Sequence, residues 1–214
     1  MNTNQAKTAA FVLSLAALQF ACSDKNETPA PVPVRAETVR NLAADPTTGV
    51  NPQTGQPLGT TGRFTFYNLR DNQIIANTDS ATNKWDVGFR GQSIIVNGGA
   101  IRSGQGGAYI HTGTFDELTT IPTSATFAQD QSATNLAIPV RSGAGWYNYN
   151  PQLNLITPIP GRVLVIRTGD GKYAKMEILS YYENAPTQID ANRDRARFYT
   201  FRYVYQPDGS MKLN

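Results

Sequence analysis

The chain has 214 residues, with 19 Lys and Arg against 16 Asp and Glu, one histidine and one cysteine. This length suits one domain with appendages, because single domains usually run to about 100–200 residues. The formal net charge of +3 is spread over scattered basic residues. That distribution argues against a nucleic-acid partner, which needs a concentrated basic field. A lone histidine and a lone cysteine also exclude a Cys/His zinc cluster.

Residues 1–21 have the anatomy of a secretion signal. Lys7 lies in a short polar lead, an apolar run covers residues 9–21, and the cysteine, Cys22, follows. The run is too short to span roughly 30 Å of hydrocarbon as a helix. Removing residues 1–21 also removes Lys7 and leaves 18 basic against 16 acidic residues.

Cys22 is the predicted site of lipid attachment. Ala21 directly before it resembles a bacterial lipoprotein cleavage box, although Gln19 and Phe20 depart from the stricter pattern. Because a free thiol is a liability in an oxidising compartment, we favour lipidation over an unpaired thiol at the end of a plain signal peptide. Acyl chains at about 0.8 kcal/mol per buried CH₂ would hold the protein on a membrane. The following "SDKNE" resembles the surface-export signal of Bacteroidetes lipoproteins.

Residues 22–35 are polar and then proline-alternating, which predicts an extended tether. We expect one β domain over residues 36–214, with a first edge strand around residues 37–42 and a long Gly/Pro/Thr-rich loop over residues 45–62.

Short runs rich in Val, Ile, Phe, Tyr and Thr follow, bounded by Gly, Pro, Asn and Asp, which is the pattern of strands. They cover residues 63–69, 73–76, 85–89, 92–97, 108–113, 162–169, 173–182 and 196–206. No long stretch has helical periodicity, so the sequence predicts an all-β, mostly antiparallel fold with at most a short helical turn.

Three local signals refine this expectation. Asp170-Gly171 between two strand runs predicts a hairpin, since glycine tolerates the positive φ of a tight turn. Residues 114–120 predict one helical turn capped by Thr114. The group of Arg193, Arg195 and Arg197 interleaved with Asp190 and Asp194 predicts a solvated turn with local pairing.

The stretch "NKWDVGFRGQSIIVNGG", residues 83–99, is interpreted as framework. Trp85, Val87 and Phe89 alternate with Asp86, Gly88 and Arg90, which predicts a strand with one apolar face and a buried Trp85.

Three segments together resemble the HmuY family of Bacteroidetes surface lipoproteins. They are residues 63–99, residues 103–123 ("SGQGGAYIHTGTFDELTTIPT") and residues 161–182 ("GRVLVIRTGDGKYAKMEILSYY"). The resemblance implies a nearly all-β fold with an open ligand pocket. It also implies binding of haem, which founding members take from host carriers and pass to an outer-membrane receptor.

The iron ligands that the resemblance implies are absent. Described members bind the iron with two histidines, and some relatives use two methionines. One ligand comes from the middle segment, and the other lies a few residues past a Gly-Trp pair. Here residues 127–140 contain neither residue type, and Asn150 and Pro151 follow Gly145-Trp146 where a histidine is expected.

Substitute ligands are therefore few. His111 is the lone histidine and a candidate iron ligand. Because it lies on a strand with apolar neighbours, a structural role is the alternative. Tyr147 and Tyr149 follow the Gly-Trp pair, and a phenolate can hold ferric iron. Met176 alternates with Ala174 and Ile178, which predicts a core position, and Met211 lies near the chain end.

The sequence thus favours a lipid-anchored protein of the outer membrane surface that binds haem or another flat hydrophobic ligand, with a TonB-dependent receptor as expected partner. The alternative is a surface interaction lipoprotein that keeps the fold without haem coordination, because function resides in the site rather than the fold. An enzyme is disfavoured: Ser142 lacks the Gly-x-Ser-x-Gly frame of a nucleophile elbow, and only His111 could serve as base.

Overall fold

A computed structural model describes residue 34, residues 36–54 and residues 57–214 of the chain. The signal segment, Cys22 and nearly all of the expected tether lie outside the described residues. The described residues all belong to one compact unit, Pro31–Asn214.

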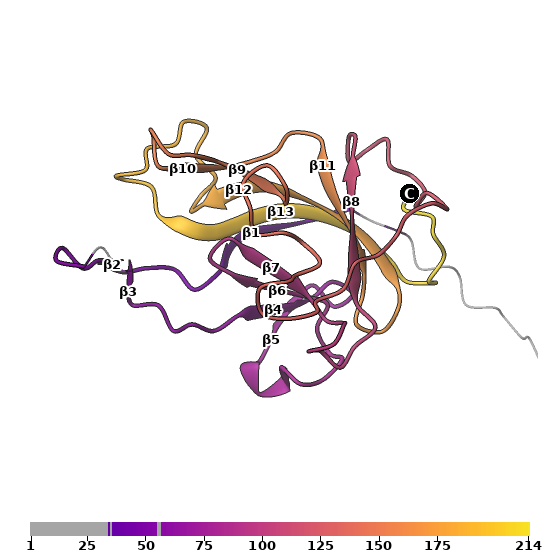
Figure 1. Cartoon of the computed structure of the whole chain (residues 1–214). Helices are drawn as coiled ribbons and strands as arrows, with labels where there is room; N and C mark the ends of the chain where they lie inside the picture. The colour runs from indigo at the N-terminus through magenta and orange to yellow at the C-terminus, as the bar shows by residue number, and fades with distance from the viewer. Residues whose placement is uncertain (1–33, 35, 55–56) are drawn as a thin grey trace, which may run out of the picture. The chain divides into compact units, whose positions relative to one another are not determined.

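Two antiparallel sheets make up most of the described fold (Figure 1). The larger has five strands in the order β1 (Ala36–Ala43), β13 (Ala196–Gln206), β12 (Tyr173–Tyr182), β11 (Arg162–Arg167) and β8 (Gly107–Thr112). The smaller has four strands in the order β5 (Gln73–Ile75), β4 (Thr65–Asn68), β6 (Val87–Arg90) and β7 (Ser93–Val96). The predicted all-β, antiparallel fold is confirmed.

Two hairpins complete the strand list. They are β9 (Tyr147–Asn150) with β10 (Leu155–Pro158), and β2 (Gly49–Val50) with β3 (Pro57–Leu58). Sequence patterning missed both. The one helical segment among the described residues is the 3-10 turn η1 (Asn77–Asp79). Residues 115–117 form a turn in which the Leu118 N–H donates to the Thr114 carbonyl at 3.3 Å.

The central core lies between the two sheets. Side chains that alternate along β4, β6 and β7 meet those of β11, β12 and β13. The rings of Phe89 and Phe201 stack with centroids 5.4 Å apart, and Tyr199 lies 4.9 Å from Phe89. Met176 is fully buried there, as its alternation predicted.

The opposite faces of the two sheets carry smaller clusters. On the five-stranded sheet, Val163, Val165 and Val204 pack under residues 115–121 and Leu213. On the four-stranded sheet, Phe66, Trp85 and Ile95 form an outer cluster. Because strand β6 begins only at Val87, Trp85 is free to turn away from the central core that Val87 and Phe89 enter. Trp85 is buried as expected, but not on the face of those two residues.

The hairpin predicted at Asp170-Gly171 forms, and residues 191–193 form a turn. Arg197 is not part of that turn, because it lies on β13 and donates to the Asp45 carbonyl at 3.0 Å. Strands β11 and β12 are joined by a tight turn in which Thr168 and Lys172 pair and Gly171 adopts φ +83°. Between β12 and β13, Arg195 pairs with Glu183 at 3.0 Å, and the Asp190 N–H donates to the Asp194 carboxylate at 2.7 Å.

Candidate functional site

The β9–β10 hairpin holds the two tyrosines that the sequence singles out. Tyr147 and Tyr149 lie two residues apart on β9, opposite Pro158 and Ile156 of β10. Although β-strand geometry places them on one face of the hairpin, their surroundings differ. Tyr147 is buried in the central core, whereas the Tyr149 side chain is 44% exposed.

Tyr147 acts as a structural residue in this geometry. Its hydroxyl donates to the Val140 carbonyl at 2.8 Å, and its ring lies 5.0 Å from that of Trp146. Burial raises the pKa of the Tyr147 phenol, since a low dielectric disfavours the phenolate. A phenolate is the form that binds ferric iron, so this environment works against coordination by Tyr147.

Tyr149 is the accessible phenol of the hairpin. Its hydroxyl lies 3.2 Å from the Asn154 amide oxygen, and its backbone N–H donates to the Ser142 hydroxyl at 2.9 Å. Leu153, in the turn that joins β9 and β10, is also exposed. The hairpin therefore presents a phenol and a leucine side chain to solvent.

Asn150 serves the hairpin turn. Its side-chain oxygen accepts the N–H groups of Gln152 and Leu153 at 3.0 and 3.2 Å. An Asx turn of this kind explains why Asn and Pro occupy a position where the family resemblance implies a histidine. The signal that could have revealed the hairpin is this Asn-Pro pair between two short Tyr- and Ile-containing runs.

His111 lies on the other side of the five-stranded sheet. It sits on β8 opposite Val163 of β11, and directly opposed residues share a face. Val163 belongs to the cluster under residues 115–121, whereas Tyr147 belongs to the central core. His111 and Tyr147 therefore cannot ligate one iron together. A ligand role for either residue alone stays a prediction.

The chain around His111 is shaped to accommodate its ring. A Cβ at Gly113 would lie 2.5 Å from the imidazole Nε2, and Gly113 has φ +154°. The Tyr109 ring lies 6.4 Å away on the same strand face. Across the described ranges, no group of three or more His, Cys, Asp or Glu could hold a metal ion.

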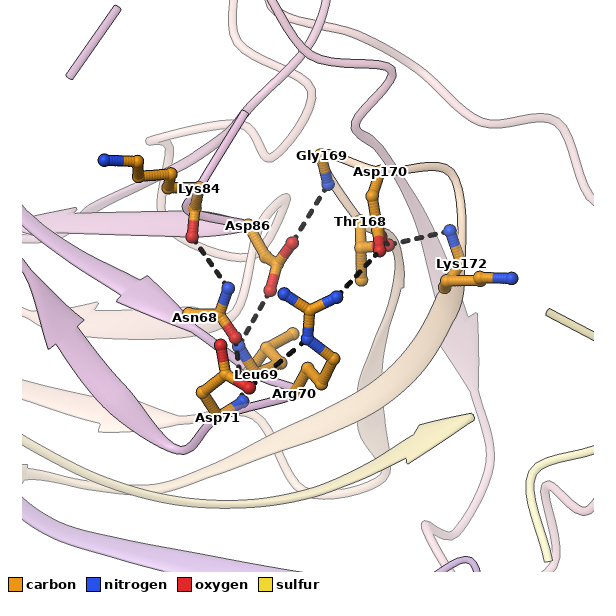
Figure 2. Close-up of polar contacts among 10 residues, drawn as sticks. All are labelled: Asn68, Leu69, Arg70, Asp71, Lys84, Asp86, Thr168, Gly169, Asp170 and Lys172. Carbon is orange, nitrogen blue, oxygen red and sulfur yellow. Dashed lines mark hydrogen bonds and ion pairs between the residues drawn. The ribbon is translucent and has the colours of Figure 1, made fainter. Parts of the chain in front are cut away.

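Asp86 of the Trp-Asp pair joins the two sheets (Figure 2). One carboxylate oxygen accepts the Leu69 N–H at 2.7 Å, where β4 ends, and the other accepts the Gly169 N–H at 3.0 Å, in the β11–β12 turn. Beside it, Arg70 lies 3.3 Å from Asp71 and 3.7 Å from Asp170. Because every one of these contacts is internal, the Trp-Asp stretch specifies the fold, as the sequence predicted.

The environment of Asp86 gives a pH-dependent stability. Burial raises the pKa of Asp86 from 3.8 to about 6, although the two backbone N–H groups oppose the shift. The pKa of Asp86 is higher in the folded protein than in the unfolded chain. The contribution of Asp86 to the free energy of unfolding is therefore full below about pH 4 and is lost as the pH rises through 6. We expect the free energy of unfolding to be greater at pH 4.5 than at pH 7.5 by roughly 2 kcal/mol from this group.

Urea unfolding of Asp86→Asn at both pH values measures the effect, because the variant removes the titration while keeping the shape. Asp116→Asn, which changes an exposed carboxylate, is the matched control and should keep the wild-type pH difference. An unchanged pH difference in Asp86→Asn would contradict the assignment.

The two antiparallel sheets define an all-β protein, and comparison with known proteins gives the family. Residues 61–199 match the family model described as HmuY protein. The chain belongs to the HmuY family. A search of curated proteins finds no match.

Several solved structures are similar to this chain. A candidate lipoprotein of Bacteroides fragilis is 19% identical, with a TM-score of 0.49, and the match covers 80% of this chain and 89% of that one. The apo HmuY analog of Tannerella forsythia is 16% identical, with a TM-score of 0.44 and coverage of 81% and 96%. Apo PinO of Porphyromonas gingivitis is 14% identical, with a TM-score of 0.45 and coverage of 86% and 100%.

Proposed function

We propose that this chain is a surface binding protein for haem or a closely related porphyrin, and that it binds this ligand without two-histidine coordination. Membership of the HmuY family over residues 61–199 is the observation that supports the ligand class. Because the sequence has a single histidine, one chain cannot coordinate the haem iron through two histidines. The role is binding rather than catalysis.

Tyr149 is the axial ligand that we propose. It follows the Gly-Trp pair in the region that supplies a ligand in the family, and it is the exposed phenol of the hairpin. Ferric iron accepts a tyrosinate as axial ligand. Leu153, in the turn of the same hairpin, is 61% exposed and offers apolar surface for a flat macrocycle.

A ferric haem titration followed at the Soret band tests the proposal. The purified chain carries Cys22→Ser, which prevents lipidation. The titration can therefore be done without detergent. We expect a saturable change, and Tyr149→Phe should weaken binding by roughly tenfold, about 1.4 kcal/mol. Tyr147→Phe and His111→Ala are the matched controls, and both should bind like the parent.

Two outcomes of the titration would count against this site. Loss of binding in His111→Ala, with Tyr149→Phe unchanged, would move the ligand to the opposite face of the five-stranded sheet. A flat titration would favour the second candidate, an interaction lipoprotein that keeps the fold without haem coordination. That candidate is supported by the burial of Tyr147 and its separation from His111, which prevent these two residues from acting as a pair of ligands.

Lipidation of Cys22 is the anchor that we propose, with the outer membrane surface as the location. Within the described part of the chain, no helix is long and apolar enough to cross a membrane. Cys22→Ser should move the protein from the membrane fraction to the soluble fraction, because acyl chains supply the membrane affinity. Immunoblotting of the two fractions measures this. A variant that stays bound as firmly as the wild type would refute the anchor.

A TonB-dependent outer-membrane receptor is the partner that we propose for ligand transfer. The resemblance to proteins that pass haem onward supports it, and no residue of this chain is assigned to the contact.

A further inference from the structure

A hollow lies on the outer face of the four-stranded sheet, and no residue of the β9–β10 hairpin lines it. We call it the outer groove. Its volume is about 330 Å³, and its lining includes Phe64, Phe66, Trp85, Ile95, Ile101 and Arg102. Apolar rings with one convergent charged group are the composition of a small-molecule site.

The apolar part of the outer groove is made by packed aromatic rings. Phe66 and Trp85 have centroids 4.5 Å apart, and Phe64 stacks on Phe66 at 6.3 Å. Gly88 makes room for this arrangement, because a Cβ there would lie 2.9 Å from Ile95 and 3.1 Å from Phe66. Ile101 stands at the rim with 42% of its surface exposed.

The charged group is Arg102, and the Gly98-Gly99 pair places it. A Cβ at Gly99 would lie 2.1 Å from the Asp130 carbonyl oxygen, so only glycine lets the chain after β7 pass this close to residue 130. The Arg102 Nη2 then lies 3.7 Å from the carboxylate of Asp130, which is fully buried. The two glycines that end the stretch of residues 83–99 thus bring Arg102 beside Asp130.

Arg102 keeps donor capacity in this position. Its Nη1 donates to the Ile101 carbonyl at 3.1 Å, and its Nε is buried without a hydrogen-bond partner. Asp130 is also held by the N–H groups of Ala137 at 2.9 Å and Val96 at 3.3 Å. The Arg102 side chain is 19% exposed, and Nη1 and Nη2 each carry two N–H groups. An anion can therefore be bound by these nitrogens without displacing Asp130.

The surroundings of the outer groove favour a negative ligand. Arg90 lies over the Phe64 ring, with its guanidinium carbon 4.2 Å from the centroid. The nearby acid, Asp79, is paired with Lys84 at 3.0 Å. A ligand with an aromatic body and one carboxylate matches both the rings and the cations.

We propose that the outer groove binds a small aromatic carboxylate, with its ring against Phe64 and Phe66 and its carboxylate on Arg102. A volume of about 330 Å³ is at the lower end for ligand pockets, which suits a body of one or two fused rings. This site needs neither iron nor Tyr149, so it goes beyond the haem function proposed above.

Isothermal titration calorimetry with 2-naphthoate tests the proposal on the full chain carrying Cys22→Ser. We expect one saturable site, with the uncharged 2-naphthamide at least tenfold weaker. Ile101→Glu should weaken 2-naphthoate binding by tenfold or more, because it puts a negative charge at the rim. Ile74→Glu is the matched control, since Ile74 is 60% exposed and does not line the groove, and it should bind like the parent.

Ile101→Glu is preferred to a change of Arg102, because removing Arg102 would leave Asp130 buried without its cation. Tyr149→Phe should leave 2-naphthoate binding unchanged, which separates this site from the haem proposal. Equal binding of 2-naphthoate and 2-naphthamide, full binding in Ile101→Glu, or no measurable heat at millimolar ligand would each overturn the proposal.

Discussion

Trp85→Ala is expected to lower the free energy of unfolding by roughly 3–5 kcal/mol, as truncation of a large core aromatic does. Trp85 is fully buried, its ring lies 4.5 Å from that of Phe66, and its indole N–H donates to the Ser80 carbonyl at 3.0 Å. The variant leaves a cavity and removes the hydrogen bond to the Ser80 carbonyl. Urea unfolding followed by far-UV circular dichroism measures the loss without depending on tryptophan fluorescence.

Ile74→Ala provides the comparison for Trp85→Ala, since it truncates an exposed side chain of the same sheet. Its effect should stay within about 0.5 kcal/mol. A loss well under 1 kcal/mol in Trp85→Ala would mean that the outer cluster of Phe66, Trp85 and Ile95 does not stabilise the four-stranded sheet.

Gly99→Ala is the second substitution with a large expected effect. Gly99 adopts φ +105°, a conformation that costs a residue with a side chain roughly 1–3 kcal/mol. The new Cβ would also lie 2.1 Å from the Asp130 carbonyl oxygen, which is backbone and must shift. Overpacking adds a similar amount, so we expect a total loss of roughly 2–6 kcal/mol in urea unfolding.

Gly62→Ala separates the two causes. Gly62 has φ +73°, but a Cβ there would meet nothing within 4 Å. The control should therefore show only the conformational cost, about 1–3 kcal/mol. If Gly99→Ala lost no more stability than Gly62→Ala, the close approach between residues 99 and 130 would be wrong.

Local patterns predicted most of the strands but not the short hairpins. The runs that became β4 to β8 and β11 to β13 alternate and are rich in β-branched and aromatic residues, so their strand character is local. Residues 147–150 read Tyr-Asn-Tyr-Asn, and Asn is depleted in strands, which hid β9. The signal at Thr114 gave the single capped turn that it predicted, in which the Thr114 hydroxyl accepts the Glu117 N–H at 3.3 Å. One capped turn is too short to propagate into a helix.

The candidate ligands show what sequence could not supply. Which face of a sheet a side chain occupies depends on strand pairing, and the pairing of His111 with Val163 is set by residues about 50 positions apart. The same holds for Asp86, whose partner Gly169 lies 83 positions away. Neither relation has a local signature, so the separation of His111 from Tyr147 emerged only from the fold.

Electron paramagnetic resonance of the ferric haem complex tests the proposed function most directly, because the spin state reports the axial ligands. One tyrosinate from Tyr149 with no second protein ligand predicts a high-spin signal that forms with the full-length Cys22→Ser chain. At a haem concentration near the Kd of that chain, the signal should be several-fold weaker in Tyr149→Phe, because binding is about tenfold weaker. A low-spin signal that persists in Tyr149→Phe, or no signal that depends on the protein, would contradict haem binding through Tyr149.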